Sequence, residues 1–263
     1  NLSAARIAET MERLNNIFSG KATRNAAGVN TGIQFVLAQY NPAGELMDEP
    51  GINRVTVEEV TEGTPPDKYH RFLSQNNAIW PHEKYLNIWL MSETKYPKFW
   101  NSITKLCVPK YRLGSETLPG LSLPPVPSTW VPKVEQIGIL FRMSTFQYFQ
   151  RSIDATAERE LVTCIGNYLG LLDTWKINNS NVNDQCNDTF AYGIVNNNGS
   201  LGTNSSWSKE VGSYRFLSEN IMDDPTGTHR SVSKDQALRM YWVLKNCAGR
   251  SMWQSDFALT GKE

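Results

Sequence analysis

Residues 163–173 carry side chains at the spacing of a metal-binding helix. Thr163 and Asn167 stand four residues apart, so on a helix both would lie on the same face. Gly170 follows where such a helix must break, and Asp173 comes where the chain would bring a third ligand round. Cys164 stands beside the first position. The working pattern is His-Glu-x-x-His-x-x-Gly-x-x-His, whose histidines hold zinc while the glutamate acts as general base.

The residue types at these positions do not supply that chemistry. A catalytic zinc ion needs three protein ligands and one open position. Thr163 and Asn167 are poor zinc ligands in this geometry, and Asp173 alone could bind. Cys164 occupies the general-base position, but a thiol in an apolar setting stays protonated and unreactive. Without a metal, no bound water has its pKa lowered, so we expect no catalytic residue and no zinc here.

Composition and charge narrow the function classes further. The chain has 263 residues, enough for one large domain or two subdomains that share a cleft. Lys+Arg and Asp+Glu both number 26, so nothing in the charge balance predicts a nucleic-acid partner. No apolar run approaches the roughly 20 residues of a membrane span. The chain begins at Asn1, and we expect a trimmed or mature form whose removed N-terminus could have carried a lipid anchor.

The cysteines favour neither a zinc knuckle nor a thioredoxin motif, because none forms a C-x-x-C pair. Cys164 lies in an apolar helical pattern and is interpreted as a buried thiol rather than as half of a disulfide. The sequence leaves the pairing open among Cys107, Cys164, Cys186 and Cys247.

The hydrophobic pattern predicts an α+β fold, with strands and one helix in the first half. An amphipathic helix is expected over 3–18, ended by Gly20, and a turn over 41–44. Five prolines in 117–133 exclude a regular helix there. Strands are predicted at 33–39, 55–60, 85–91 and 137–141.

In the second half, the pattern predicts a helix over 158–172 and a last helix from Ser233, its N-cap. The segment between them, 173–219, is rich in Asn, Gly and Ser and is expected to be mostly loop. Asp184 and Asp188 with nearby carbonyl groups could hold calcium, although a solvated loop is the favoured interpretation.

Several segments, taken in order, resemble the pappalysin family of metzincin metallopeptidases over most of the chain. Asn167-Tyr168-Leu169-Gly170-Leu171-Leu172-Asp173-Thr174-Trp175 is similar to the second half of that family's zinc helix. Asn220-Ile221-Met222-Asp223 resembles its Met-turn, the methionine floor below the metal. Further similar segments are 14–15, 32–38, 51–54, 85–89, 120–124, 138–139, 187–189 and 236–240.

The resemblance implies a zincin fold of the metzincin type. We therefore expect a twisted mixed β-sheet with two long helices above a cleft, in an N-terminal subdomain of residues 1–173. Residues 174–263 would form an irregular C-terminal subdomain with the Met-turn and the final helix. Gly170 and Met222 would be structural positions. The resemblance also implies an extracytoplasmic protein, either secreted or a surface lipoprotein of the periplasm or outer membrane.

The replaced residues lead to our main functional hypothesis. The chain would be a pseudopeptidase without cofactor that docks an extended peptide or a protein in the retained cleft. One alternative is an active zinc-dependent metallopeptidase with unusual ligands. Another is a structural component of a cell-surface assembly. The residue types at Thr163, Cys164 and Asn167 favour the first hypothesis.

Overall fold

The computed structural model describes residues 2–55, 73, 77–91, 137–142, 156–177, 183–194, 208–211, 214–224, 227–246 and 249–262. Its helices are α1 (Ala4–Phe18), α4 (Thr156–Tyr168), α5 (Lys234–Asn246) and α6 (Phe257–Thr260), with a 3-10 turn at Met252–Gln254. The predicted residues 56–60, the proline-rich segment 117–133 and the family-like residues 120–124 lie outside these ranges.

The strands pair two by two within the described ranges. β1 (Ile88–Met91) runs parallel to β2 (Ile139–Arg142), with Ile88 opposite Ile139. β3 (Trp175–Ile177) is parallel to β4 (Tyr192–Ile194), whereas β5 (Ser208–Val211) is antiparallel to β6 (Tyr214–Leu217). The fold is therefore α+β with parallel and antiparallel pairing, as the sequence predicts.

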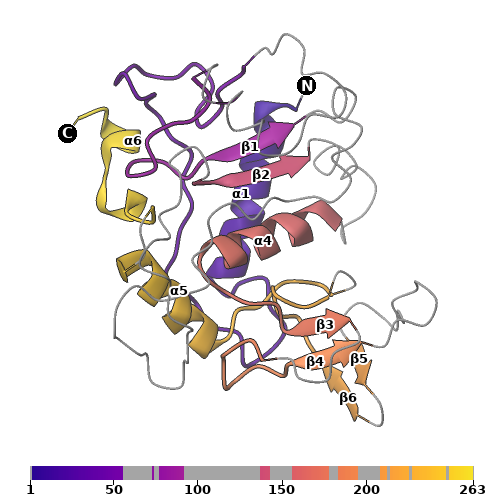
Figure 1. Ribbon diagram of the computed structural model, residues 1–263. Coiled ribbons are helices and arrows are strands. Elements are labelled where there is room, and N and C mark those ends of the chain that lie inside the picture. Colours follow the sequence, from indigo (N-terminus) through magenta and orange to yellow (C-terminus); the bar gives the residue numbers. More distant parts are fainter. Residues whose placement is uncertain are drawn as a thin grey trace.

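Figure 1 shows how these elements surround the long helices. α1 and α4 contact each other, and α4 also contacts β2 of the upper strand pair. β3 to β6 gather at the lower right, with β4 against β5, while α5 and α6 lie on the opposite side. Helix α4 thus runs through the middle of the molecule.

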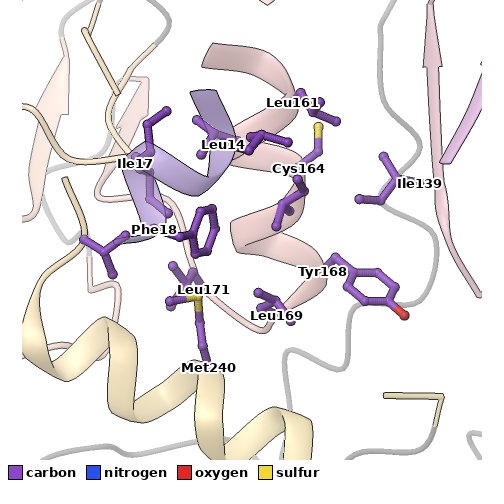
Figure 2. Close-up of a cluster of buried hydrophobic side chains, with 14 of the residues drawn as sticks. Leu14, Ile17, Phe18, Ile139, Leu161, Cys164, Tyr168, Leu169, Leu171 and Met240 are labelled. Carbon is purple, nitrogen blue, oxygen red and sulfur yellow. The ribbon is translucent and has the colours of Figure 1, made fainter. Parts of the chain in front are cut away.

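The hydrophobic core lies between α1, α4 and α5. Leu14 and Phe18 of α1 are completely buried and face Leu161 and Leu169 on or just after α4 (Figure 2). Met240 reaches the same cluster from α5. Burying a large apolar side chain contributes about 1.5–3 kcal/mol, so this cluster fixes α4 against both neighbouring helices.

The predicted first helix is confirmed. The side chain of Ser3 caps it by accepting a hydrogen bond from the Arg6 backbone N–H at 3.3 Å. The helix ends at Phe18, and Gly20 then takes a left-handed conformation with φ of +75°. The predicted turn at 41–44 is also confirmed, because Gly44 N donates to Asn41 O at 2.9 Å.

The predicted strand at 33–39 is wrong, since no neighbouring strand pairs with this segment among the described residues. The Asn15 side chain on α1 makes the hydrogen bonds that a neighbouring strand would otherwise make. Its Nδ2 donates to Phe35 O at 2.9 Å, and its Oδ1 accepts from Phe35 N at 2.8 Å. A side-chain amide thus pairs with the backbone groups of Phe35. The alternating apolar residues of 33–39 therefore reflect packing along α1 and not a strand.

Other predicted boundaries shift. The strand expected at 85–91 begins only at Ile88, whereas that expected at 137–141 appears as β2. The predicted loop 173–219 is wrong in part, because β3 to β6 lie within it. These strands have three or four residues each, too few for a period of two to stand out from the surrounding Asn and Gly residues.

Replacing Asn15 by Ala should destabilise the fold. Asn15→Ala removes both hydrogen bonds to the partly buried backbone of Phe35, and the loss of two such bonds costs about 1–3 kcal/mol. Asn16→Ala is the matched control, since it gives the same gain in helix propensity without touching Phe35. Urea unfolding monitored by circular dichroism measures both variants. Equal stability of the two variants would contradict the pairing.

Candidate functional site

Helix α4 ends in a Schellman motif formed by the glycine of the sequence pattern. Leu171 N donates to Gly166 O at 2.8 Å, and Gly170 N donates to Asn167 O at 2.9 Å. Gly170 has φ of +90°, and a Cβ there would lie 2.4 Å from Cγ2 of Val243. The helix predicted to reach 172 therefore stops at Tyr168.

Two buried arginines bind the carbonyl groups at this helix end. Arg239 of α5 donates from Nε to Gly170 O at 2.6 Å, and Arg250 donates from Nε to Tyr168 O at 2.8 Å. The Arg250 guanidinium also lies 3.7 Å above the Tyr168 ring. Cations stabilise the negative end of a helix dipole, and both arginines are fully buried. The start of the segment that carries Asp173 is therefore held firmly against α5.

Met222 packs below α4. It is completely buried, and its Sδ lies 2.6 Å from where a Cβ on Gly166 would stand. Only a glycine at this position lets the sulfur come so close. The turn around Met222 is closed by Asp223 N, which donates to Asn220 O at 3.1 Å, and by Met222 N, which donates to Asn220 Oδ1 at 2.9 Å.

The start of α5 holds the same turn through a capping box. Gln236 N donates to Ser233 Oγ at 3.3 Å, and Ser233 N donates to Gln236 Oε1 at 3.1 Å. The Gln236 and Asn220 amides also pair, with both N–H···O distances 2.9 Å. The predicted last helix with Ser233 as N-cap is confirmed, and its first turn anchors the Met222 turn.

The side chains at the positions predicted to correspond to metal ligands lie at the same contact. Thr163 Oγ1 donates to Ile221 O at 2.7 Å, so its hydroxyl links α4 to the Met222 turn. Asn167 is almost fully buried and donates from Nδ2 to Thr163 O at 2.9 Å. Thr174, next to the partly buried Asp173, donates from its N and its Oγ1 to Met222 O, both at 3.1 Å.

Cys164 lies in the hydrophobic core. It is buried in the cluster with Leu14 and Leu161 (Figure 2). Of the two cysteines within the described ranges, Cys164 and Cys186, neither is disulfide-bonded, as predicted for Cys164. Cys107 and Cys247 lie outside the described residues. Cys164, which the sequence analysis places at the position of a general base, is therefore a core side chain.

Asp184 and Asp188, the predicted calcium residues, both accept hydrogen bonds from the protein. Asp184 is buried and accepts from Thr189 Oγ1 at 2.5 Å, and its burial raises the pKa of this carboxyl group. Asp188 is exposed and accepts from Ser233 Oγ at 2.6 Å and from Asp235 N at 2.9 Å, which caps α5. Calcium binding here stays a prediction.

Metal-ligand geometry can be assessed only for the described part of the chain. There, no group of three or more His, Cys, Asp or Glu side chains is arranged to hold a metal ion. Likewise, no described helix is long and apolar enough to cross a membrane.

Sequence analysis missed a buried polar cluster that follows Met222. Tyr192 OH donates to Asp224 Oδ2 at 2.7 Å, and burial together with Asp223 and Asp224 raises the pKa of this tyrosine. His229 Nε2 lies 3.0 Å from Asp223 O and 3.1 Å from Asp224 O. All four side chains are buried. The adjacent Asp223 and Asp224 were the available signal, but their partner Tyr192 is 32 residues from Asp224 in the sequence.

Comparison with solved structures shows a metallopeptidase-like fold of the metzincin type. Mirolysin in complex with compound 9 gives a TM-score of 0.65 at 19% identity, over 100% of this chain and 92% of that one. Mature mirolysin of Tannerella forsythia in complex with a cleaved peptide gives 0.60 at 20% identity, over 99% and 92%. A promirolysin mutant of that organism gives 0.60 at 19% identity, over 98% and 80%.

The fold is thus shown by similarity to solved structures. No protein-family model matches the sequence, and no curated protein does so either. An identity near 20% shows the fold alone, and the fold agrees with the mixture of helix and sheet described above.

Gly170→Ala should destabilise the protein by about 2–3 kcal/mol. The new Cβ would impose an unfavourable left-handed conformation and overpack Val243. Gly44→Ala is the control, because Gly44 has φ of +79° but its nearest neighbour would lie 3.3 Å away. Chemical unfolding of both variants separates conformational strain from overpacking. A loss for Gly170→Ala no larger than for Gly44→Ala would argue against the tight α4–α5 contact.

Met222→Leu should cost less than about 1.5 kcal/mol if Met222 serves only packing, because volume-conserving core substitutions are tolerated. Met222→Ala should cost about 2–5 kcal/mol, because it leaves a cavity below Gly166. Thermal unfolding by calorimetry measures both. A loss for Met222→Leu as large as for Met222→Ala would give the methionine a role beyond filling space.

Proposed function

We propose that this chain is a degenerate metzincin of pappalysin type that has lost zinc binding and peptidase activity and acts by binding peptide or protein. The observation that carries the proposal is the hydrogen bond from Thr163 Oγ1 to Ile221 O. At the position of a first zinc ligand, the chain has a neutral hydroxyl that holds the Met222 turn.

The neighbouring positions support the same conclusion. The Asn167 amide nitrogen is used within α4, and a side-chain amide is a weak ligand for zinc. Cys164 belongs to the core, where it is badly placed to activate water. Asp173 remains the single carboxylate of the pattern, and one carboxylate does not replace two imidazoles. These side chains do not fit a catalytic zinc ion.

Peptide binding is supported by a hydrogen-bonded unit of the fold and by one of the similar structures. The helix end at Gly170, the Met222 turn and the start of α5 form one hydrogen-bonded unit that does not require a metal. One of the similar mirolysin structures holds a cleaved peptide, and its fold matches this chain over nearly its whole length. Peptides often bind as an added strand at a sheet, where backbone hydrogen bonds give affinity without catalysis.

The wider proposal follows the resemblance. Residues 1–173 and 174–263 form the two halves of one domain, with the cleft between them. The protein works outside the cytoplasm, secreted or held by a lipid on its N-terminus. An active peptidase with unusual ligands and a purely structural surface protein are the competing functions, and zinc content with peptide binding separates them.

The first test is metal content. Protein purified without chelator or His-tag and then incubated with zinc should hold well under one zinc per chain by elemental analysis. Thr163→His/Asn167→His should raise the zinc content, because two imidazoles then join Asp173. This double variant leaves Cys164 in the core and so avoids burying a carboxylate. One tightly held zinc per unmodified chain, with chelator-sensitive peptide hydrolysis, would establish the active peptidase instead.

Peptide binding is tested on the same sample. An array of unstructured peptides should retain the protein without any peptide being cut, as judged by mass spectrometry. Failure to bind any peptide or unfolded protein would refute the binding function and leave the structural alternative.

A further inference from the structure

A cavity of about 200 Å³ opens beside the Met222 turn. We call it the Asp223 pocket. Its wall includes four nearly fully buried polar residues, namely Thr174, Asp223, Ser231 and Ser233. Exposed Asp188 and Phe190 also line it and mark its rim. In concave ligand sites, a few polar groups fix the orientation of the ligand.

The charge of the pocket is negative. Asp188 and Asp223 contribute carboxylates, and none of the described residues that line the pocket is Lys, Arg or His. Asp188 lies exposed at the rim, whereas Asp223 is buried. An anionic ligand would therefore be repelled.

The direction of the hydrogen bonds in the pocket wall also argues against an anionic ligand. Three hydroxyl groups of the wall already donate within the protein: Thr174 to Met222 O at 3.1 Å, Thr189 to Asp184 at 2.5 Å and Ser233 to Asp188 at 2.6 Å. The Asn220 amide likewise donates to Gln236. A hydroxyl whose proton is committed offers only lone pairs to a ligand. These groups suit a ligand that donates hydrogen bonds.

Aromatic rings complete the pocket. Phe190 and Phe216 both line it, and their ring centroids lie 4.5 Å apart. Phe190 is 52% exposed, although its partner Phe216 packs inward on Tyr192 with a centroid distance of 5.3 Å. The negative face of an aromatic ring attracts an organic cation, and the ring also covers an attached apolar chain.

From these three features we infer that the Asp223 pocket binds a small organic cation, an ammonium group on a short apolar chain. The ammonium group supplies positive charge and three donors to a wall of carboxylates and lone pairs. The apolar chain packs on Phe190 and Phe216. A bare metal ion fits less well, because the cavity is several times the volume of one water molecule. This inference is independent of the proposed peptide binding.

The test compares two probes of equal length in isothermal titration calorimetry at neutral pH. n-Pentylammonium should bind, and uncharged 1-pentanol should bind at least about tenfold more weakly. Raising the salt concentration should weaken n-pentylammonium binding, because screening reduces attraction to the carboxylates. Equal affinity for the two probes would overturn the inference, since the pocket would then be merely apolar.

Variants of the exposed Phe190 locate the site without disturbing the buried network. Phe190→Leu should weaken n-pentylammonium binding about 2–30-fold, the range of a cation–π contact, whereas the control Phe190→Tyr should keep it. Unchanged affinity in Phe190→Leu would place the amine elsewhere and refute the assignment. Calcium chloride that binds tightly and displaces the amine would make this a metal site and also overturn it.

Discussion

The close approach of Met222 to α4 is the contact around which the described lower half of the molecule is organised. It requires Gly166, because any side chain there would occupy the place of the sulfur. It is then secured by hydrogen bonds to two successive carbonyls, with Thr163 donating to Ile221 O and Thr174 to Met222 O. Packing sets the distance and hydrogen bonds set the register, so the turn has one position relative to the helix.

Hydrogen bonds extend the contact around Met222 to α5. Asn220 both closes the Met222 turn and pairs with Gln236, which completes the capping box of α5. From α5, Arg239 returns to Gly170 at the end of α4. The polar groups thus link α4 to the Met222 turn, the turn to α5, and α5 back to the end of α4. Buried polar networks are stabilising only when their members are satisfied, and mutual support of this kind favours a single arrangement.

Sequence patterns predicted the parts of this fold that depend on local chemistry. α1, the turn at 41–44, β2 and the Ser233 cap depend on periodicity, glycine and capping residues, which can be recognised within a few neighbours. The segment at 33–39 was misinterpreted because Asn15 lies about 20 residues away along the chain. The four short strands β3 to β6 depend on partners rather than on pattern.

The residues of the candidate site also fall into those that local patterns predict and those that they do not. Gly170 could be assigned from its spacing alone, because a helix end needs a residue that tolerates a positive φ. The structural role of Thr163 could not be predicted in this way. Its acceptor is the backbone carbonyl of Ile221, which is 58 residues away. The clustering of Tyr192, His229, Asp223 and Asp224 is equally invisible to local patterns. Sequence analysis singled out Thr163, Cys164 and Asn167, and the structure shows which contacts these residues make.

A metal site contributes to the stability of the fold that forms it, because ligands from distant segments are drawn together by one ion. In this chain, hydrogen bonds and packing hold α4 against the neighbouring segments. Thr163 and Asn167 supply hydrogen bonds at the relevant turns of α4, and Cys164 adds apolar burial on the core side. Each of these side chains makes a structural contact that involves no metal ion. The contacts between α4 and the Met222 turn are therefore made by the chain's own side chains, and a fold can keep its architecture while the residues at one site differ.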